Sequence, residues 1–305
     1  MRLATVVLLG IFILTGCTIF GTIEETQTYD HTAAVLTPSA RIVPDMINES
    51  SAIVKSQRFE NTYWTLNDSG DSPRIFALRE DGTLISPEGS KGYNGISIVN
   101  AQNSDWEDMA LDNAGHLYIA DSGNNINERR DLVIYQIPEP DPTKQSSSQP
   151  AIAFPFHYPD QKSFPPEQMN FDGEALFWSA GHLYLLTKHR SDTHTKLYRF
   201  DTLEPDRDLP LTLLGEYEMG DMVTAADTSP DGRQLAVLTR SSVWLFEVLQ
   251  PGDFFFKGKA YKLQISAGQC EGICIDGNLV RITNEQRDIF LIPLNTIRLH
   301  PNLII

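Results

Sequence analysis

Short runs of alternating apolar and polar residues dominate the chain, and turn-forming Gly, Pro, Asn and Asp residues separate them. A period of two places every second side chain on one face, as in a half-buried β-strand. No stretch keeps the apolar period of 3.6 residues that an amphipathic α-helix requires. The pattern therefore predicts an all-β protein with few or no helices.

Five segments of the chain resemble one another. Each has an acidic or hydroxyl residue in the leading position, an alternating apolar run, a turn, a second apolar run and a polar exit; the turn contains glycine in four of them and is looser in the segment that starts at Glu49. DWEDMALDNAGHLYIADSGNN, residues 105–125, shows this pattern most clearly. The leading residues are Glu49, Glu107, Glu174, Thr224 and Glu271. Such self-similarity indicates a repeat architecture in which each unit is one supersecondary element.

Two further strand-like runs follow each of the first four hairpins, so each unit supplies four antiparallel strands. This arrangement predicts a β-propeller, whose blades bury their faces against one another. The direct count gives five blades, and a sixth blade built from weaker segments or a β-sandwich is the alternative. The fifth unit ends early, after DIFLIPL at 288–294. We expect the unassigned run SARIVPD, at 39–45, to close the ring by pairing with it.

The N-terminal residues have the pattern of an export signal. Arg2 precedes an apolar run at 3–14 that is too short to span a bilayer comfortably. LTGC, ending at Cys17, resembles the lipobox of bacterial lipoproteins, which implies that Cys17 carries the lipid. Thr18 follows instead of Asp, and by analogy with enterobacterial sorting this favours the outer membrane, facing the periplasm. A plain signal peptide with an incidental cysteine is the alternative.

These patterns divide the chain into three parts. We expect residues 1–16 to be a lipoprotein signal peptide, 17–39 a lipidated polar tether, and 40–305 a single β-propeller domain. Cys270 and Cys274 would lie about 13 Å apart on one strand, because each residue adds ~3.3 Å. A disulfide tolerates less than about 7 Å, so both cysteines are expected to be free and buried.

The chain is acidic, with a formal net charge of −16 over 305 residues. This charge argues against a nucleic-acid partner, because nothing in it would neutralise phosphates along a groove. It permits cation binding, although acidic surfaces most often serve solubility.

Polar residues gather at both ends of each hairpin, and the propeller model explains why. Antiparallel pairing brings the two ends to the same edge of the sheet, so five such pairs should meet around one mouth of the central channel. The residues expected there as a ligand or metal site are Glu49, Asn67, Asp68, Glu107, Asp121, Asn124, Glu174, Glu271 and Glu285. Those expected to contact an anion are Lys188, His189 and Arg240. Alternatively, the acids tie blades together by accepting backbone hydrogen bonds, and the cations only neutralise them.

Clustered carboxylate and amide oxygens suit Ca²⁺ or Mg²⁺ as ligands. No segment matches the EF-hand pattern, however, and the histidines lack a metal-binding spacing. There is no G-x-S-x-G nucleophile motif either. Catalytic residues therefore stay unassigned.

ESSAI, YWTLNDSGD, DWEDMALD, LYIADSGNN and CEGICIDG together resemble a widespread group of uncharacterised secreted bacterial β-propeller lipoproteins, over about residues 40–295. More distantly the chain is similar to the gluconolactonase and senescence-marker lactonases. In those propellers an acid at the start of an inner strand helps bind a divalent metal, and this resemblance implies that role for Glu49. A weaker similarity, to phytase-like esterase propellers, comes from the Asp-rich loops.

Three functions are compatible with these features. The first is a lipid-anchored envelope propeller whose polar mouth binds a small ligand, a divalent cation or a protein partner. The second is a Ca²⁺- or Mg²⁺-dependent hydrolase of a lactone or phosphoester. The third is an inert scaffold for envelope complexes.

Overall fold

The computed structural model describes residues 7–9, 22–24 and 33–302. The chain divides into two compact units, Met1–Thr32 and Ala33–Ile305. In the first unit, β1 (Val7–Leu9) pairs antiparallel with β2 (Thr22–Glu24). Cys17 lies outside the described residues, as does most of the predicted signal peptide. Among the described residues, none belongs to a helix with the length and apolar character needed to cross a membrane.

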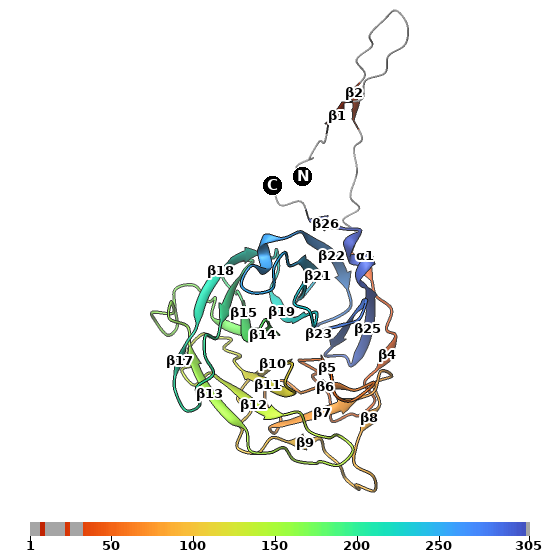
Figure 1. The fold of residues 1–305 in the computed structure, drawn as a ribbon, viewed down its shortest axis with the longest axis vertical. Coiled ribbons are helices and arrows are strands. Elements are labelled where there is room, and N and C mark those ends of the chain that lie inside the picture. The colour runs from red at the N-terminus through yellow and green to blue at the C-terminus, as the bar shows by residue number, and fades with distance from the viewer. Residues whose placement is uncertain (1–6, 10–21, 25–32, 303–305) are drawn as a thin grey trace, which may run out of the picture. The chain divides into compact units, whose positions relative to one another are not determined.

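The second unit is a five-bladed β-propeller, as the sequence predicts (Figure 1). Its five small antiparallel sheets are arranged in a ring, and the predicted hairpins are the innermost strands. The first strands of neighbouring blades, which are β5, β10, β14, β19 and β23, contact one another in a closed circuit around the axis.

The main strands of each blade follow one another along the chain, and the short strands β3, β4, β17 and β26 are added from elsewhere in the sequence. Blade 1 contains β5 (Val54–Lys55), β6 (Tyr63–Thr65), β7 (Arg74–Leu78), β8 (Leu84–Ile85) and β9 (Ile96–Ser97). Blade 2 contains β10 (Trp106–Leu111), β11 (His116–Asp121), β12 (Val133–Pro138), β13 (Ile152–His157) and the short parallel β17 (Leu209–Pro210). Blade 3 contains β14 (Asp172–Ser179), β15 (His182–Lys188), β16 (His194–Arg199) and β18 (Thr212–Glu218).

Blades 4 and 5 include the strands that close the ring. Blade 4 contains β19 (Val223–Thr228), β20 (Gln234–Thr239), β21 (Ser242–Glu247) and β22 (Ala260–Ser266), with β3 (Ala34–Val35) and β26 (Pro301–Asn302) added to β22. Blade 5 contains β23 (Cys270–Asp276), β24 (Leu279–Asn284), β25 (Asp288–Pro293) and β4 (Ala40–Arg41). The pairing of Ala40 with Ile289 confirms that the N-terminal run completes the last blade. The short helices η1 (Phe255–Lys257) and α1 (Leu294–Arg298) lie beside these blades.

The hydrophobic core consists of one apolar layer between each pair of neighbouring blades. Trp64 of blade 1 and Trp106 of blade 2 belong to one such layer, and both are fully buried. The seam between blades 5 and 1 is filled by a smaller cluster that includes Phe76 and Ile289. Fully burying a large apolar side chain contributes about 1.5–3 kcal/mol, so these layers hold the blades in fixed positions. Cys270 and Cys274 are both free and buried, as expected.

Candidate functional site

A β-bulge sets the direction of the leading residue in the inner hairpins. In blade 3 the pairing register shifts between Gly173 and Ala175, so Glu174 is the extra residue. Equivalent shifts in blades 2, 4 and 5 occur around Glu107, Thr224 and Glu271. Because a bulge re-aims a side chain and bends its strand, these residues leave the regular pleat at one mouth of the channel.

In blade 1 the equivalent position holds Ser51, and not Glu49 as the sequence comparison suggested. The Ser50–Asn67 bridge and the Val54–Trp64 pair differ by one residue in register, which places the extra residue between them. Ser51 Oγ donates to the backbone oxygen of Glu107 at 2.5 Å and so ties blade 1 to blade 2. The side chain of Glu49 is exposed and does not line the cavity described below. The structure therefore removes the alignment on which a metal-binding role for Glu49 rested.

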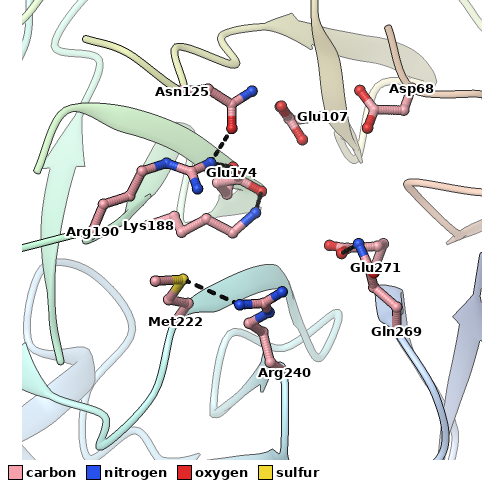
Figure 2. A pocket seen from close by; sticks show the side chains of 10 residues that line it. All are labelled: Asp68, Glu107, Asn125, Glu174, Lys188, Arg190, Met222, Arg240, Gln269 and Glu271. Atoms are coloured by element: carbon pink, nitrogen blue, oxygen red, sulfur yellow. Dashed lines mark hydrogen bonds and ion pairs between the residues drawn. The ribbon is translucent and has the colours of Figure 1, made fainter. Parts of the chain in front are cut away.

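The mouth encloses a polar cavity of about 180 Å³ (Figure 2). Its walls are formed by Asp68, Glu107, Asn125, Glu174, Lys188, Arg190, Met222, Arg240, Gln269 and Glu271. Figure 2 shows Asp68 and Glu107 across the cavity from Arg240, with Lys188 and Arg190 on a third side. The cavity thus has a carboxylate side and a cationic side.

Glu107 is the central carboxylate of the acidic side. Its side chain is only 6 % exposed, and among the described residues no donor forms a hydrogen bond with its carboxylate. Carboxylate oxygens of Asp68, Asp105 and Glu107 all lie within 4.8 Å of one another. Gly123 packs directly against Glu107 and Asp105, where a Cβ atom would clash with both acids. We call Asp68, Asp105 and Glu107 the open triad.

The pKa values of all three acids are raised. Burial is the main cause for Glu107, and the nearby charges of Glu174 and Asp68 add to it. Burial and the carboxylate of Asp68 raise the pKa of Asp105 to about 6. Burial also raises the pKa of Asp68. The charges of Lys188 and Arg129 lower these pKa values but do not offset burial and the repulsion between the acids.

A second group of carboxylates, Asp172 and Glu174, is already paired with cationic side chains of the protein. Oxygens of Asp172 and Glu174 also approach Glu107 within 4.8 Å. Arg190 donates to Asp172 Oδ2 at 2.6 Å, and Lys188 Nζ donates to Glu174 Oε2 at 2.6 Å. Burial alone would lower the pKa of Lys188, but the carboxylates around it, led by Glu174, raise it. The protein therefore neutralises this group with its own side chains.

Three of the predicted site residues have structural contacts instead. Asn67 donates to the Met46 backbone oxygen at 2.8 Å and accepts from the Glu49 N–H. Asp121 is buried, pairs with Arg129 at 2.8 Å and accepts the backbone N–H of Asp105. Asn124 is buried and donates to the backbone oxygen of Phe171. These side chains shape the loops that carry the site, and none of them lines the cavity.

Of the predicted anion contacts, Lys188 and Arg240 line the cavity and His189 does not. His189 is buried and its Nδ1 lies 2.7 Å from Asp192, so it points away from the cavity. Its neighbour Arg190, from the same cationic stretch of sequence, lines the cavity. Arg240 lines it as well, and within the described chain its guanidinium contacts only Met222 Sδ, at 3.8 Å, with no acid in ion-pair range.

Glu271 and Glu285 lie together at the edge of the mouth. Gln269 Nε2 donates to Glu271 at 3.1 Å and to Glu285 at 2.5 Å. Burial raises the pKa of both acids, and for Glu285 the Glu271 charge adds to the effect. Glu271 lines the cavity and Glu285 does not.

Sequence reasoning missed Asp105 and Asp172, although the sequence contains a signal for both. Each lies two residues before the bulge residue, as Asp105-Trp106-Glu107 and Asp172-Gly173-Glu174. Residues two apart on an extended chain share a face, so an Asp-x-Glu pair presents two carboxylates together. The loop after β15 brings Arg190 back to Asp172.

The open triad fits a hard divalent cation. Ca²⁺ takes 6–8 oxygen ligands, and three carboxylates that bind through one or both oxygens can supply much of that shell. Zn²⁺ would require nitrogen or sulfur ligands that the triad does not offer. The donor set thus fits Ca²⁺ or Mg²⁺.

No protein-family model matches the chain, and no curated protein matches it. Several solved propellers are structurally similar. A protein described as a gluconolactonase is 15 % identical, with a TM-score of 0.41 over 76 % of this chain and 70 % of that chain. A gluconolactonase of Xanthomonas campestris is 12 % identical, with a TM-score of 0.41 over 87 % and 99 % of the two chains. The Pan2 WD40 domain of Neurospora crassa is 9 % identical, with a TM-score of 0.41 over 85 % and 94 % of the two chains.

Proposed function

We propose that the propeller binds a divalent cation, Ca²⁺ or Mg²⁺, at Asp68, Asp105 and Glu107, and holds a small anionic molecule between this cation and Arg240. The observation that carries the proposal is the Glu107 carboxylate, which is buried, faces the cavity and has no hydrogen-bond partner among the described residues. A buried charge without a partner is costly, and a bound cation removes that cost.

The contrast between the two acid groups supports the choice of ligand. Asp172 and Glu174 are paired with Arg190 and Lys188, so the fold neutralises carboxylates at this mouth where it needs no ligand. The open triad lies beside them without such a partner in the described chain. A cation that comes from solution completes the same pattern.

Arg240 supports the anionic part of the ligand. Its guanidinium lies at the cavity across from Asp68 and Glu107 and makes no ion pair with a described acid. A guanidinium binds carboxylate and phosphate groups through two parallel hydrogen bonds. A carboxylate or phosphate would thus complement both Arg240 and the cation.

Hydrolysis of a lactone or phosphoester is the second candidate. It is favoured by Glu271, which lines the cavity outside the proposed cation site and whose pKa is raised by burial, as a general base that takes a proton from water near neutral pH requires. A divalent cation, when bound, supplies Lewis-acid polarisation of a carbonyl or phosphoryl oxygen. Arg240 would orient the anionic part of such a substrate.

We also propose that the protein is anchored to the bacterial envelope through lipid on Cys17, with the propeller on the periplasmic side of the outer membrane. The LTGC sequence supports this location. Incorporation of labelled palmitate tests it: the wild type should be labelled and Cys17→Ala should not. Labelling of both proteins would contradict the anchor. An inert scaffold for envelope complexes is the remaining alternative.

Isothermal titration of the purified protein with CaCl₂ and MgCl₂ tests the cation site. We expect saturable binding to the wild type, and at least a tenfold loss of affinity in Glu107→Gln and in Asp105→Asn. Glu204→Gln is the matched control, because Glu204 forms an exposed ion pair with Arg207 away from the mouth. Absence of binding to the wild type, or equal affinity in Glu107→Gln, would refute the proposal.

A further inference from the structure

The opposite mouth of the channel holds a second, larger cavity of about 530 Å³. In blade 3, Asp172 pairs with Lys188 at the acidic mouth, whereas Ser179 pairs with His182 at the other end of the same hairpin. All five blades contribute to the cavity at this second end, through residues such as Val54, Leu111, Trp178, Asp227 and Ile275. It shares no lining residue with the cation site.

Two polar groups of this cavity have no partner. Ser179 is only 3 % exposed, and its hydroxyl forms no hydrogen bond within the described part of the chain. The indole N–H of Trp178, also in the wall, has no hydrogen-bond acceptor among the same residues. Gly232 packs beside Ser179, and a Cβ there would be 3.0 Å from Ser179 Oγ, so a larger residue at 232 would crowd the hydroxyl.

The charged groups at this mouth already have ion-pair or hydrogen-bond partners within the protein, which favours a ligand without net charge. Lys55 forms an ion pair with Asp276. Asp231 accepts from the Ser229 hydroxyl at 2.6 Å. The two oxygens of Asp227 accept the backbone N–H groups of Thr228 and Ile275, each at 2.8 Å. Each carboxylate oxygen has two lone pairs, so Asp227 can still accept hydrogen bonds from ligand hydroxyls.

The walls combine these polar groups with apolar surface. Val54, Leu111 and Ile275 face the channel, and Pro230 and Pro251 form the rim. The Trp178 ring is partly exposed and stacks on Tyr118, with ring centroids 5.6 Å apart and an interplanar angle of 8°. A cavity of this volume lies in the range of small-molecule sites, roughly 300–1,000 Å³.

We infer that this second mouth binds a neutral saccharide. A sugar ring has C–H faces that pack on indole and proline surfaces, and hydroxyls that both donate and accept hydrogen bonds. The Ser179 hydroxyl and the Trp178 N–H can pair with sugar oxygens, and the Asp227 carboxyl can accept from sugar hydroxyls. The inference is independent of the proposed cation site at the other mouth.

Tryptophan fluorescence tests this site directly. Of the four tryptophans, Trp64 and Trp106 are 0 % exposed and Trp244 is 2 % exposed, so Trp178 is the one that a ligand can reach. Titration of the full protein with maltose, glucose and N-acetylglucosamine should give a saturable change in emission for at least one of these sugars. Absence of saturable binding by all three at millimolar concentrations, measured by calorimetry as well, would overturn the inference.

Variants locate the binding. Ser179→Ala should weaken it about fivefold, the value for one hydrogen bond of about 1 kcal/mol. Asn113→Trp fills the rim from an exposed position and should abolish binding in calorimetry. Ser146→Ala, at an exposed serine outside the cavity, should bind as the wild type does. Wild-type affinity in Asn113→Trp, or loss of sugar binding in Glu107→Gln, would place the sugar elsewhere and refute the assignment.

Discussion

Lys188 Nζ lies 2.6 Å from Glu174 Oε2, and the two side chains are 13 % and 1 % exposed. The lysine therefore neutralises a carboxylate that is almost entirely removed from water. It also lies within the electrostatic influence of Glu107 and Glu271, which raise its pKa. One buried cation thus acts on acids from three blades.

Lys188→Met should destabilise the propeller by about 3–5 kcal/mol, because it leaves the buried Glu174 with only the more distant Arg190, at 4.0 Å, as a cationic partner. The double variant Lys188→Met/Glu174→Met should recover most of this loss, since it removes both charges. Chemical denaturation measures the free energy of unfolding of each protein. Lys144→Met is the control, because its ion pair with Asp141 is exposed and should contribute less than about 1 kcal/mol. Equal stability of both single variants would contradict the role of the buried pair.

Cation affinity should fall as the pH falls. The pKa of Asp105 is about 6, and burial raises the pKa of Glu107 and Asp68 above their ordinary values. Protonated carboxyls must lose their protons before they bind a cation, so acid competes with Ca²⁺. Calcium titrations from about pH 7 to about pH 5 should show falling affinity and, in buffers of different ionisation enthalpy, proton release. Affinity that does not change over this range would exclude these acids as the ligands.

Without a cation, Glu107→Gln should be more stable than the wild type at neutral pH. The folded-state pKa of Glu107 is raised, so its contribution to stability is complete at low pH and is lost as the pH rises through that value. Glutamine has no proton to lose and avoids this loss. Thermal denaturation in EDTA should therefore give a higher Tm for Glu107→Gln.

Calcium should reverse this order. A cation at a hundred times its Kd stabilises the wild type by about 2.7 kcal/mol, and the variant should gain little. A wild-type Tm that is identical in EDTA and in calcium would contradict the cation site even if Glu107→Gln is stabilised.

Asp108 should be a structural residue, although it follows Glu107 directly. Its Oδ2 accepts the backbone N–H of Leu176 at 2.8 Å and so joins blade 2 to blade 3. Asp108→Ala leaves that buried N–H without a partner, at a cost of about 1–3 kcal/mol in the free energy of unfolding. Asp45→Ala, at an exposed acid, should cost much less. An Asp108→Ala protein with wild-type stability would disprove this link between the blades.

Arg240→Met should weaken binding of the anion without weakening binding of the cation. Binding of phosphate or a small carboxylate in the presence of calcium should weaken about tenfold or more, because charged hydrogen bonds contribute ~1.5–3 kcal/mol. Calcium binding alone should persist. Arg233→Met provides the control, since Arg233 is exposed and does not line the mouth. Unchanged anion affinity in Arg240→Met would remove Arg240 from the site.

The propeller could be predicted from the sequence because the blades repeat the same alternation, and four of the five inner hairpins repeat the same glycine turn. Even ring closure was predictable, since the run at 39–45 had no partner within its own unit and DIFLIPL had no neighbour. Both predictions depend only on the need of strands to pair and to bury their apolar faces. This need leaves a clear alternation of apolar and polar residues in the sequence.

The site was less predictable because it depends on bulges and loops. Glu49 matched the other leading residues in chemical type, but the bulge of this hairpin follows Ser50, so Ser51, two residues further on, takes the equivalent position. Pairing in β5 covers only Val54 and Lys55, so its sequence contains little information on register. Arg190 reaches Asp172 through a loop, and no periodicity of the chain encodes that path.

The ring is held shut by very short strands at its N-terminal end. β3 pairs with blade 4 and β4 pairs with blade 5, each through two residue pairs. The N-terminal segment continues directly into these strands. A pulling force applied through it would act on blades 4 and 5 before it acted on the innermost strands around the channel. The closing strands are therefore also the first part of the propeller to bear a pulling force applied at its N-terminal end, and blades 4 and 5 would share that force.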